Sequence, residues 1–243
     1  MSPSPLTPPW GTGIALFADG ADLDSIRALA ADDRVGGFTT NPTLMRKAGI
    51  TDYITFAQQA AAIVAPRSLS LEVFADDIAN IIRQARIIHT WGDNVYVKVP
   101  VTTTDGAPTT DAIRTLAAEG VRLNVTALTT LEQVARVTDE LTGSVASIVS
   151  VFAGRIADSG VDPVPLMSAA AVLTSQRTGC DLLWASSREV LNIVQAWQSG
   201  CQIITLTADL WAKLGGVGRP LADISLDTVQ MFARDADHAG YQL

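Results

Sequence analysis

The sequence offers little from which a protein could build a metal site or a disulfide framework. Its 243 residues include two histidines and two cysteines, and no HxH, HExxH or CxxC spacing occurs among them. The opening segment also lacks the basic and apolar regions of a signal peptide. We therefore expect no protein-built zinc site, and we predict that the chain works in a reducing cytoplasm.

Long apolar runs and an excess of basic charge are missing as well. No stretch of about 18 apolar residues is present, and the net charge is −8. With 48% hydrophobic and 17% charged residues, the composition is that of a globular protein with a substantial core. We expect neither nucleic acid nor a membrane as a partner, because each would need a concentrated basic face. A few local arginines could still hold a small anionic substrate.

What the sequence does contain is a repeated rhythm. Short apolar runs rich in β-branched residues alternate with longer segments of helical spacing. Their interval of roughly 20 to 35 residues suits parallel strands joined by helical crossovers. The eight runs cover residues 14–19, 35–41, 69–74, 95–100, 121–128, 147–152, 181–186 and 201–207.

Eight strand-helix units without a composition break favour one closed (β/α)₈ barrel, a TIM barrel, over an open doubly wound sheet. We predict an α/β protein in which this barrel forms a catalytic domain over residues 14–243. Residues 1–13 carry four of the eleven prolines and predict an irregular N-terminal arm. Disorder of this arm and packing against a neighbouring subunit are both open.

Polar residues within the apolar runs are the candidates for chemistry, because catalytic groups in such a barrel come from the carboxyl ends of strands. Each also has a structural explanation. A single Asp or Asn at a strand end is often a helix cap or a turn former, and barrels bury some hydrogen-bonded polar residues. The candidates are Asp19, Asn41, Glu72, Lys98, Asn124, Thr126, Ser150 and Ser186.

Lys98 stands out because it lies inside the apolar stretch VYVKVP. Lysine is rarely buried without a partner, so one interpretation is a structural ion pair with Glu72. The other is catalytic: a lysine desolvated in an apolar pocket has a lowered pKa, and its neutral amine can form a Schiff base with a carbonyl. Aldol chemistry on a Schiff base also needs acid and base groups, and Glu72 and Asp19 are the carboxylates among the candidates.

Two arginines indicate a phosphorylated substrate. Arg155 follows the sixth run and Arg188 follows the seventh, and barrels often bind phosphate beside their last strands. The donors of a guanidinium group form a fork that suits phosphate. Each arginine alone could equally be a surface residue or a residue at the start of a helix.

Seven motifs, in a shared order and at a shared spacing, resemble the transaldolase family, especially the small transaldolases grouped with fructose-6-phosphate aldolase. The resemblance runs from about residue 14 to about residue 215. It implies a class I aldolase barrel with the Schiff-base lysine at Lys98, sugar phosphates as substrates, a homo-oligomeric assembly, and neither a metal nor an organic cofactor. The motifs are FADGAD, GGFTTNPTLM, SLEVF, VYVKVPVTTTDG, LNVTAL, SVFAGRI and LLWASSRE.

Roles for the other candidates follow from the same resemblance. Asp19 corresponds to the base for the C4 hydroxyl of the substrate, and Glu72 with Thr126 corresponds to the pair that holds a catalytic water. The remaining positions correspond to substrate-binding residues. Asn41, Asn124 and Ser150 match partners of the dihydroxyacetone unit, and Ser186, Arg155 and Arg188 match positions that bind the sugar phosphate.

Two positions separate the subgroups of the family. Aldolase-type members have glutamine at the position of Glu72 and tyrosine at that of Phe152, a further substrate-binding position, so this chain follows the transaldolase pattern. The resemblance is imperfect, because Ser187 replaces an aromatic residue and Val151 replaces a proline. The pocket for the acceptor sugar could therefore be altered.

The sequence thus favours a transaldolase that takes a dihydroxyacetone unit from sedoheptulose 7-phosphate or fructose 6-phosphate. Two enzymatic alternatives stay open: an aldolase that releases free dihydroxyacetone, and a transaldolase of a specialised pathway that builds a higher-carbon sugar phosphate in place of pentose phosphate intermediates. A deoxyribose-phosphate aldolase would usually have a second lysine near the first, and no strand supplies one. A non-catalytic sugar-phosphate-binding barrel is the alternative from another class.

Overall fold

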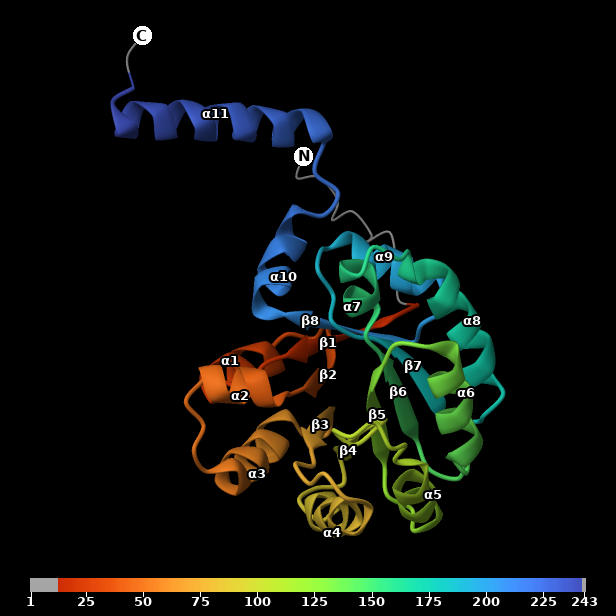
Figure 1. Cartoon of the computed structure of the whole chain (residues 1–243). Helices are drawn as coiled ribbons and strands as arrows, with labels where there is room; N and C mark the ends of the chain where they lie inside the picture. The colour runs from red at the N-terminus through yellow and green to blue at the C-terminus, as the bar shows by residue number, and fades with distance from the viewer. Residues whose placement is uncertain (1–12, 242–243) are drawn as a thin grey trace.

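The computed structural model describes residues 13–241, in which eight parallel strands close into a barrel with neighbours in sequence order (Figure 1). The closing pair joins the first strand to the last, with Ala15 opposite Ile203 and Asp19 opposite Thr207. The predicted TIM barrel is therefore confirmed. The strands are β1 (Ala15–Asp19), β2 (Val35–Thr39), β3 (Ser68–Glu72), β4 (Val95–Pro100), β5 (Leu123–Leu128), β6 (Ser147–Val151), β7 (Cys180–Trp184) and β8 (Ile203–Thr207).

All eight predicted runs coincide with strands, and their ends differ by at most two residues. The fourth run matches β4 at both ends. The second, third and seventh runs continue two residues past their strands into the loops at the carboxyl edge, where Asn41 and Ser186 lie. The predicted arm at residues 1–13 lies, apart from residue 13, outside the described residues.

Helices cover the outside of the barrel, where Figure 1 shows them around the strands. Short polar side chains cap the start of several of them: Asp22 caps the first helix, and Asp52 and Asp77 cap two others. The covering helices are α1 (Leu23–Ala30), α3 (Tyr53–Val64), α4 (Ile78–His89), α5 (Thr110–Ala118), α6 (Leu131–Glu140), α8 (Pro163–Ser175), α9 (Leu191–Gln198) and α10 (Ala208–Lys213).

Two short helices, α2 (Pro42–Lys47) and α7 (Ala153–Asp158), lie in the loops that follow β2 and β6. Both therefore stand at the carboxyl edge of the barrel, where active sites of this fold are found. The sequence starts α2 with Asn41, whose side chain accepts from the Leu44 backbone N–H at 2.9 Å, followed by Pro42 in the first turn. The side chain at the start of α2 is thereby fixed near the end of β2.

The core has two layers. The larger one fills the space between strands and helices and includes Leu69, Leu71 and Trp184. The smaller one lies inside the barrel, because alternate strand residues point inward. This inner cluster consists of Phe17, Ile148, Leu183, Ala185 and Ile203, with Phe152 packed against it.

The last helix, α11 (Leu221–Ala239), extends away from the barrel (Figure 1). It follows the 3₁₀ turn η1 (Leu214–Gly216), and the described part of the chain buries none of its residues. Leu226, Val229 and Phe232 are 55%, 61% and 62% exposed. Within residues 13–241, no helix is both long and apolar enough to cross a membrane.

Candidate active site

Lys98 lies inside the barrel, on the central part of β4, and is 8% exposed. Its Nζ donates to Glu72 Oε1 at 2.8 Å and to the backbone carbonyl of Thr40 at 2.6 Å. The strand register makes the first contact unavoidable, because Glu72 and Lys98 are Cα partners on β3 and β4. The amine is thus held by a carboxylate and a carbonyl inside an otherwise apolar strand, and the ion pair with Glu72 that the sequence offered as one interpretation is present.

Glu72 has both of its carboxylate oxygens engaged. Oε1 accepts from Lys98, and Oε2 accepts from the Thr40 hydroxyl at 2.8 Å. The backbone of Glu72 is also fixed, because the Tyr53 hydroxyl donates to its carbonyl at 2.9 Å. Glu72 is 5% exposed. The pair is therefore a buried, hydrogen-bonded ion pair, whose charges would be costly if either partner were removed.

Asp19 ends β1 at the same edge of the barrel. Its carboxylate accepts from the Thr39 hydroxyl at 2.9 Å and from Asn41 Nδ2 at 3.2 Å. Burial raises the pKa of Asp19, while the positive charge of Lys98 and the hydrogen bonds from Thr39 and Asn41 act in the opposite direction. A carboxylate with a raised pKa is a stronger base than an ordinary aspartate.

Asn41 combines the two roles that the sequence left open. Its Oδ1 caps α2, and its Nδ2 faces Asp19. The cap fixes the orientation of the amide, so the donor is directed at the carboxylate. The structure therefore shows the helix cap and a contact with Asp19, and binding of substrate by Asn41 stays a prediction.

Asn124 and Ser150 form a second polar group deeper in the barrel. Ser150 Oγ donates to Asn124 Oδ1 at 2.6 Å, and Asn124 Nδ2 donates to Ser70 Oγ at 2.9 Å. Asn124 is also the register partner of Lys98 on the next strand. Three adjacent strands, β3, β4 and β5, thus place Glu72, Lys98 and Asn124 at one level.

Thr126 and Phe152 lie nearer the rim. Thr126 is half-buried on β5 and opposite Pro100, two residues beyond Lys98. The strand is irregular here, since its register with β6 shifts between Val125 and Leu128. Phe152 follows β6 and packs against the inner apolar cluster. Its ring therefore forms part of the wall of the barrel mouth.

Ser186, Arg155 and Arg188 lie on the side of the mouth formed by α7 and the loop after β7. Ser186 has φ of 62°, and a Cβ on Gly154 would lie 1.6 Å from the Ser186 carbonyl oxygen. Only glycine lets α7 approach this loop so closely. Both arginines are exposed, and the Arg188 guanidinium makes a two-pronged ion pair with Asp158 of α7. Arg155 and Asp158, the ion-pair partner of Arg188, thus lie on the same short helix, α7.

Several polar residues at the site were not among the sequence candidates. Thr205 shares a hydrogen bond of 2.6 Å with Thr39, and Ser187 is buried with its hydroxyl donating to the Thr205 carbonyl at 2.7 Å. Alternate residues of a strand point to opposite faces of the sheet, so the alternation of polar and apolar residues in SLSLE, ITLT and FTTN could have indicated which of these polar residues face the interior. Those missed are Thr39, Thr40, Ser70 and Thr205.

A family model described as transaldolase/fructose-6-phosphate aldolase matches residues 16–243. Since this match covers nearly the whole barrel, it decides the family. The chain belongs to the transaldolase/fructose-6-phosphate aldolase family. The resemblance noted from the seven sequence motifs is therefore confirmed.

Individual members of the transaldolase/fructose-6-phosphate aldolase family are similar along most of the chain. A probable transaldolase of Dehalococcoides mccartyi is 33% identical over 218 residues, which are 86% of this chain and 96% of the relative. One of a Roseiflexus species is 33% identical over 87% of this chain and 93% of its own length. Probable transaldolase 2 of Listeria monocytogenes is 30% identical over 87% of this chain and 92% of its own length.

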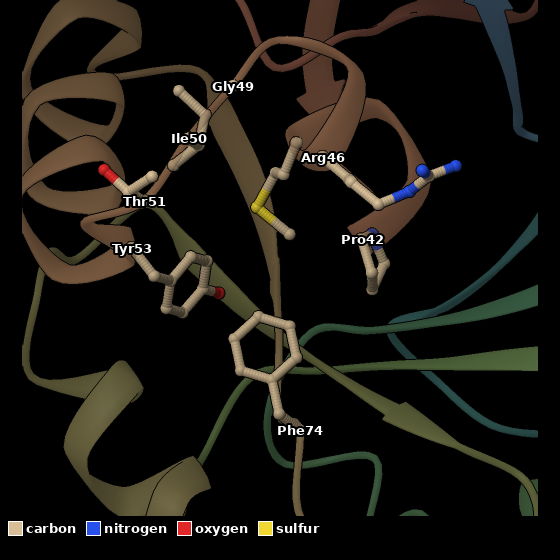
Figure 2. Close-up of a pocket in the computed structure, with 8 residues that line it drawn as sticks. Pro42, Arg46, Gly49, Ile50, Thr51, Tyr53 and Phe74 are labelled. Carbon is tan, nitrogen blue, oxygen red and sulfur yellow. The ribbon is translucent and has the colours of Figure 1, made fainter.

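No group of three or more His, Cys, Asp or Glu residues between positions 13 and 241 is arranged to hold a metal ion. A separate hollow of about 380 Å³ lies between α2, α3 and the segment after β3 (Figure 2). Its wall is mostly apolar, with Arg46 at one side, and the Tyr53 and Phe74 rings meet there edge to face at 4.7 Å. Arg46 is the cationic side chain among its lining residues.

Proposed function

We propose that the protein is a transaldolase, which moves a dihydroxyacetone unit from a ketose phosphate to an aldose phosphate through a Schiff base on Lys98. The observation that carries the proposal is the buried pair of Lys98 and Glu72, with Asp19 at the same edge of the barrel. A class I aldolase reaction needs an amine, a proton-transfer group beside it, and a second base. These three side chains supply that set.

The pair can start the reaction by itself. Transfer of one proton from the Lys98 ammonium to Glu72, across 2.8 Å, gives a neutral amine and a carboxylic acid. The amine adds to the ketone carbon, and the proton it loses passes to the oxygen, forming a carbinolamine. Glu72 then protonates the hydroxyl, water leaves, and an iminium bond to Lys98 remains beside the Glu72 carboxylate. Thr126 is proposed to help hold this water.

Asp19 would carry out the next step. It takes the proton of the C4 hydroxyl, the C4–O bond becomes a carbonyl, and the electrons of the C3–C4 bond move into the iminium to give an enamine. The aldose phosphate leaves, and an acceptor aldose phosphate reacts by the reverse steps. Asn41 lies close enough to Asp19 to orient it. Asn124 and Ser150 are proposed to bind the hydroxyls of the three-carbon unit.

The phosphate of the sugar is proposed to bind Ser186, Arg155 and Arg188. The ion pair with Asp158 uses Nε and one terminal nitrogen of Arg188. Since arginine has five N–H donors, the other terminal nitrogen still has donors for a phosphate oxygen. Gly154 supports the site by allowing α7 to contact the Ser186 loop.

Transfer is favoured over release of dihydroxyacetone by Glu72 and Phe152, the residues at the two positions that separate the subgroups. The two residues differ chemically at the first position, because Glu72 can exchange a proton with Lys98 and a glutamine could not. We place the reaction in the cytoplasm, in keeping with two cysteines that are buried free thiols. The acceptor could be an ordinary aldose phosphate or, given Ser187, a larger one.

The test has two arms: the protein is incubated with fructose 6-phosphate and borohydride, and release of glyceraldehyde 3-phosphate is followed in a separate incubation without borohydride, with and without erythrose 4-phosphate. We expect a mass gain of one reduced dihydroxyacetone unit on Lys98, and glyceraldehyde 3-phosphate released continuously only with the acceptor. Unphosphorylated fructose should react more slowly if the arginine site binds phosphate. Continuous release without acceptor would instead identify an aldolase. Sugar-phosphate binding without any adduct would identify a non-catalytic barrel.

We also propose that the protein assembles with further copies of itself through α11. Helices in proteins gain most of their stability by packing an amphipathic face, and the residues Leu226, Val229 and Phe232 form an exposed apolar face on α11. A membrane surface is a poor partner, because four aspartates and one arginine leave the helix acidic. A second copy offers the apolar hollow behind α2 with Arg46 beside it (Figure 2). Helix and hollow are different surfaces, so such contacts would repeat around a ring.

Replacing Phe232 with aspartate should therefore lower the mass of the assembly in solution, measured by light scattering, to that of a single chain or a smaller assembly. Phe74→Asp in the hollow should have the same effect. The matched control is Gln230→Asp, which adds the same charge on the face of α11 that carries Asp223 and Asp227 and should leave the mass unchanged. A wild-type protein that is a single chain at all concentrations would contradict the proposal.

A further inference from the structure

β2 runs into two consecutive threonines that contact different carboxylates. The Thr39 hydroxyl donates to Asp19 at 2.9 Å, and the Thr40 hydroxyl donates to Glu72 at 2.8 Å. We propose that Thr40 is a positioning residue for the formation and hydrolysis of the Schiff base, and that it acts by holding Glu72 and Lys98 together. The inference rests on the proposed function and adds a residue to which the sequence motifs assign no role.

Thr40 contacts both members of the pair. Its backbone carbonyl accepts from Lys98 Nζ at 2.6 Å, and its hydroxyl reaches Glu72 Oε2. The residue is fully buried, and its own backbone N–H donates to the Ser70 carbonyl at 3.3 Å. The same carbonyl, 3.0 Å from the Thr40 hydroxyl, is a second acceptor for its one proton, and the charged carboxylate at 2.8 Å is the stronger of the two. Hydrogen bonding to Ser70 of β3 therefore holds Thr40, which contacts both Lys98 and Glu72, in place.

The consequence concerns the orientation of the Glu72 carboxylate. Its terminal torsion has a broad energy minimum, so a single contact at Oε1 would leave the plane of the group free to turn. The second contact, from Thr40 to Oε2, fixes that plane and directs Oε1 at the nitrogen. Proton transfer depends on this alignment, because hydrogen bonds weaken steeply when they bend. Losing the hydroxyl would also leave a buried carboxylate oxygen without a donor.

Thr39 provides a matched control. It is the neighbouring residue, has the same side chain, is 3% exposed, and likewise donates to a carboxylate. Its carboxylate is Asp19, which the proposed mechanism uses only when the carbon–carbon bond breaks or forms. A ligand that forms a Schiff base without breaking such a bond should therefore respond to Thr40 and not to Thr39.

Dihydroxyacetone is such a ligand, and the experiment measures how fast borohydride traps it on the enzyme. Intact mass is followed for the wild type, Thr40→Val, Thr40→Ser and Thr39→Val, together with kcat and KM for transfer from fructose 6-phosphate to erythrose 4-phosphate. We expect Thr40→Val to slow trapping about 10- to 100-fold, the fold-change for a lost hydrogen bond to a charged group. Thr40→Ser should restore trapping to within a few-fold. Thr39→Val should trap at the wild-type rate while its kcat falls.

Each other outcome overturns the inference. Trapping by Thr40→Val at the wild-type rate would show that the hydroxyl does not position Glu72, and equal slowing by Thr39→Val would indicate a general packing effect. Circular dichroism and thermal melts establish folding. If Thr40→Val and the second variant Thr40→Ala both fail to fold, the residue is structural. Absence of trapping in the wild type would overturn the proposed function as well, and this result is distinct from the others.

Discussion

Replacing Lys98 with methionine is expected to remove the trapped adduct completely and to lower kcat by a factor on the order of 10⁴ or more, as for other covalent nucleophiles. Methionine has a similar length and no amine, so the barrel wall stays filled. The measurements are intact mass after borohydride and steady-state transfer between sugar phosphates. Lys47→Met and Lys213→Met are the controls, since both lysines are exposed helix residues, and each should keep the wild-type adduct and rate.

The same substitution should also destabilise the fold. It leaves the Glu72 carboxylate in a site that is 5% exposed without its cation, and removing one partner of a buried ion pair costs about 3–5 kcal/mol. The double variant Lys98→Met/Glu72→Gln should recover part of this loss, as measured by urea unfolding, while staying inactive. Wild-type turnover or an adduct on another residue in Lys98→Met would contradict the assignment of the nucleophile.

Replacing Asp19 with asparagine is expected to block the reaction one step later. Without this base, kcat for transfer should fall about 10²- to 10⁴-fold, but the Schiff base should still form. Borohydride should then trap the whole ketose phosphate on Lys98, because the carbon–carbon bond is not broken. Intact mass separates this adduct from the three-carbon adduct of the wild type. Trapping of the three-carbon unit at the normal rate in Asp19→Asn would show that another group is the base.

The role of Asp19 as a base should also be visible in the dependence of kcat/KM on pH for the wild type. Asp19 must be deprotonated to act as a base, and burial raises its pKa above the ordinary 3.8. On acidification, kcat/KM should therefore begin to fall at a higher pH than for an exposed aspartate. In Thr39→Val the fall should move to a still higher pH, because the hydrogen bond from Thr39 lowers the pKa of Asp19. If the fall in kcat/KM at low pH stays at the same pH in Thr39→Val, the titrating group is not Asp19.

The barrel and much of the site could be predicted from sequence for a physical reason. Parallel strands that are buried on both faces appear in the sequence as continuous apolar runs. A polar residue within such a run has either a structural, hydrogen-bonded role or a chemical one. Lys98 is identified in this way from the sequence alone. The contact with Glu72 was suggested as an ion pair, and the register of β3 and β4 supplies the reason for it.

Other features depend on geometry that a sequence does not carry. Thr40 lies just beyond the last residue of β2, where the direction of a side chain follows from the turn and not from strand alternation. The ion pair between Arg188 and Asp158 joins two loops whose approach is set by Gly154. The exposed position of α11 could not be predicted either, because the pattern of apolar and polar residues in an amphipathic helix is the same whether the helix packs on its own barrel or elsewhere.

The pairing of Glu72 with Lys98 links catalysis to the closure of the whole barrel. In a closed sheet the alignment of two strands cannot shift without changing the alignment of the others, and a shift by one residue would turn Lys98 from the interior toward the helices. A molecule in which β4 has closed one residue out of register would therefore lack the pair of Glu72 and Lys98, and we expect it to be inactive. The fraction of chains on which borohydride traps one dihydroxyacetone unit would report the molecules in which β3 and β4 are correctly paired, and a time course of that fraction during refolding would measure the rate at which this pairing appears.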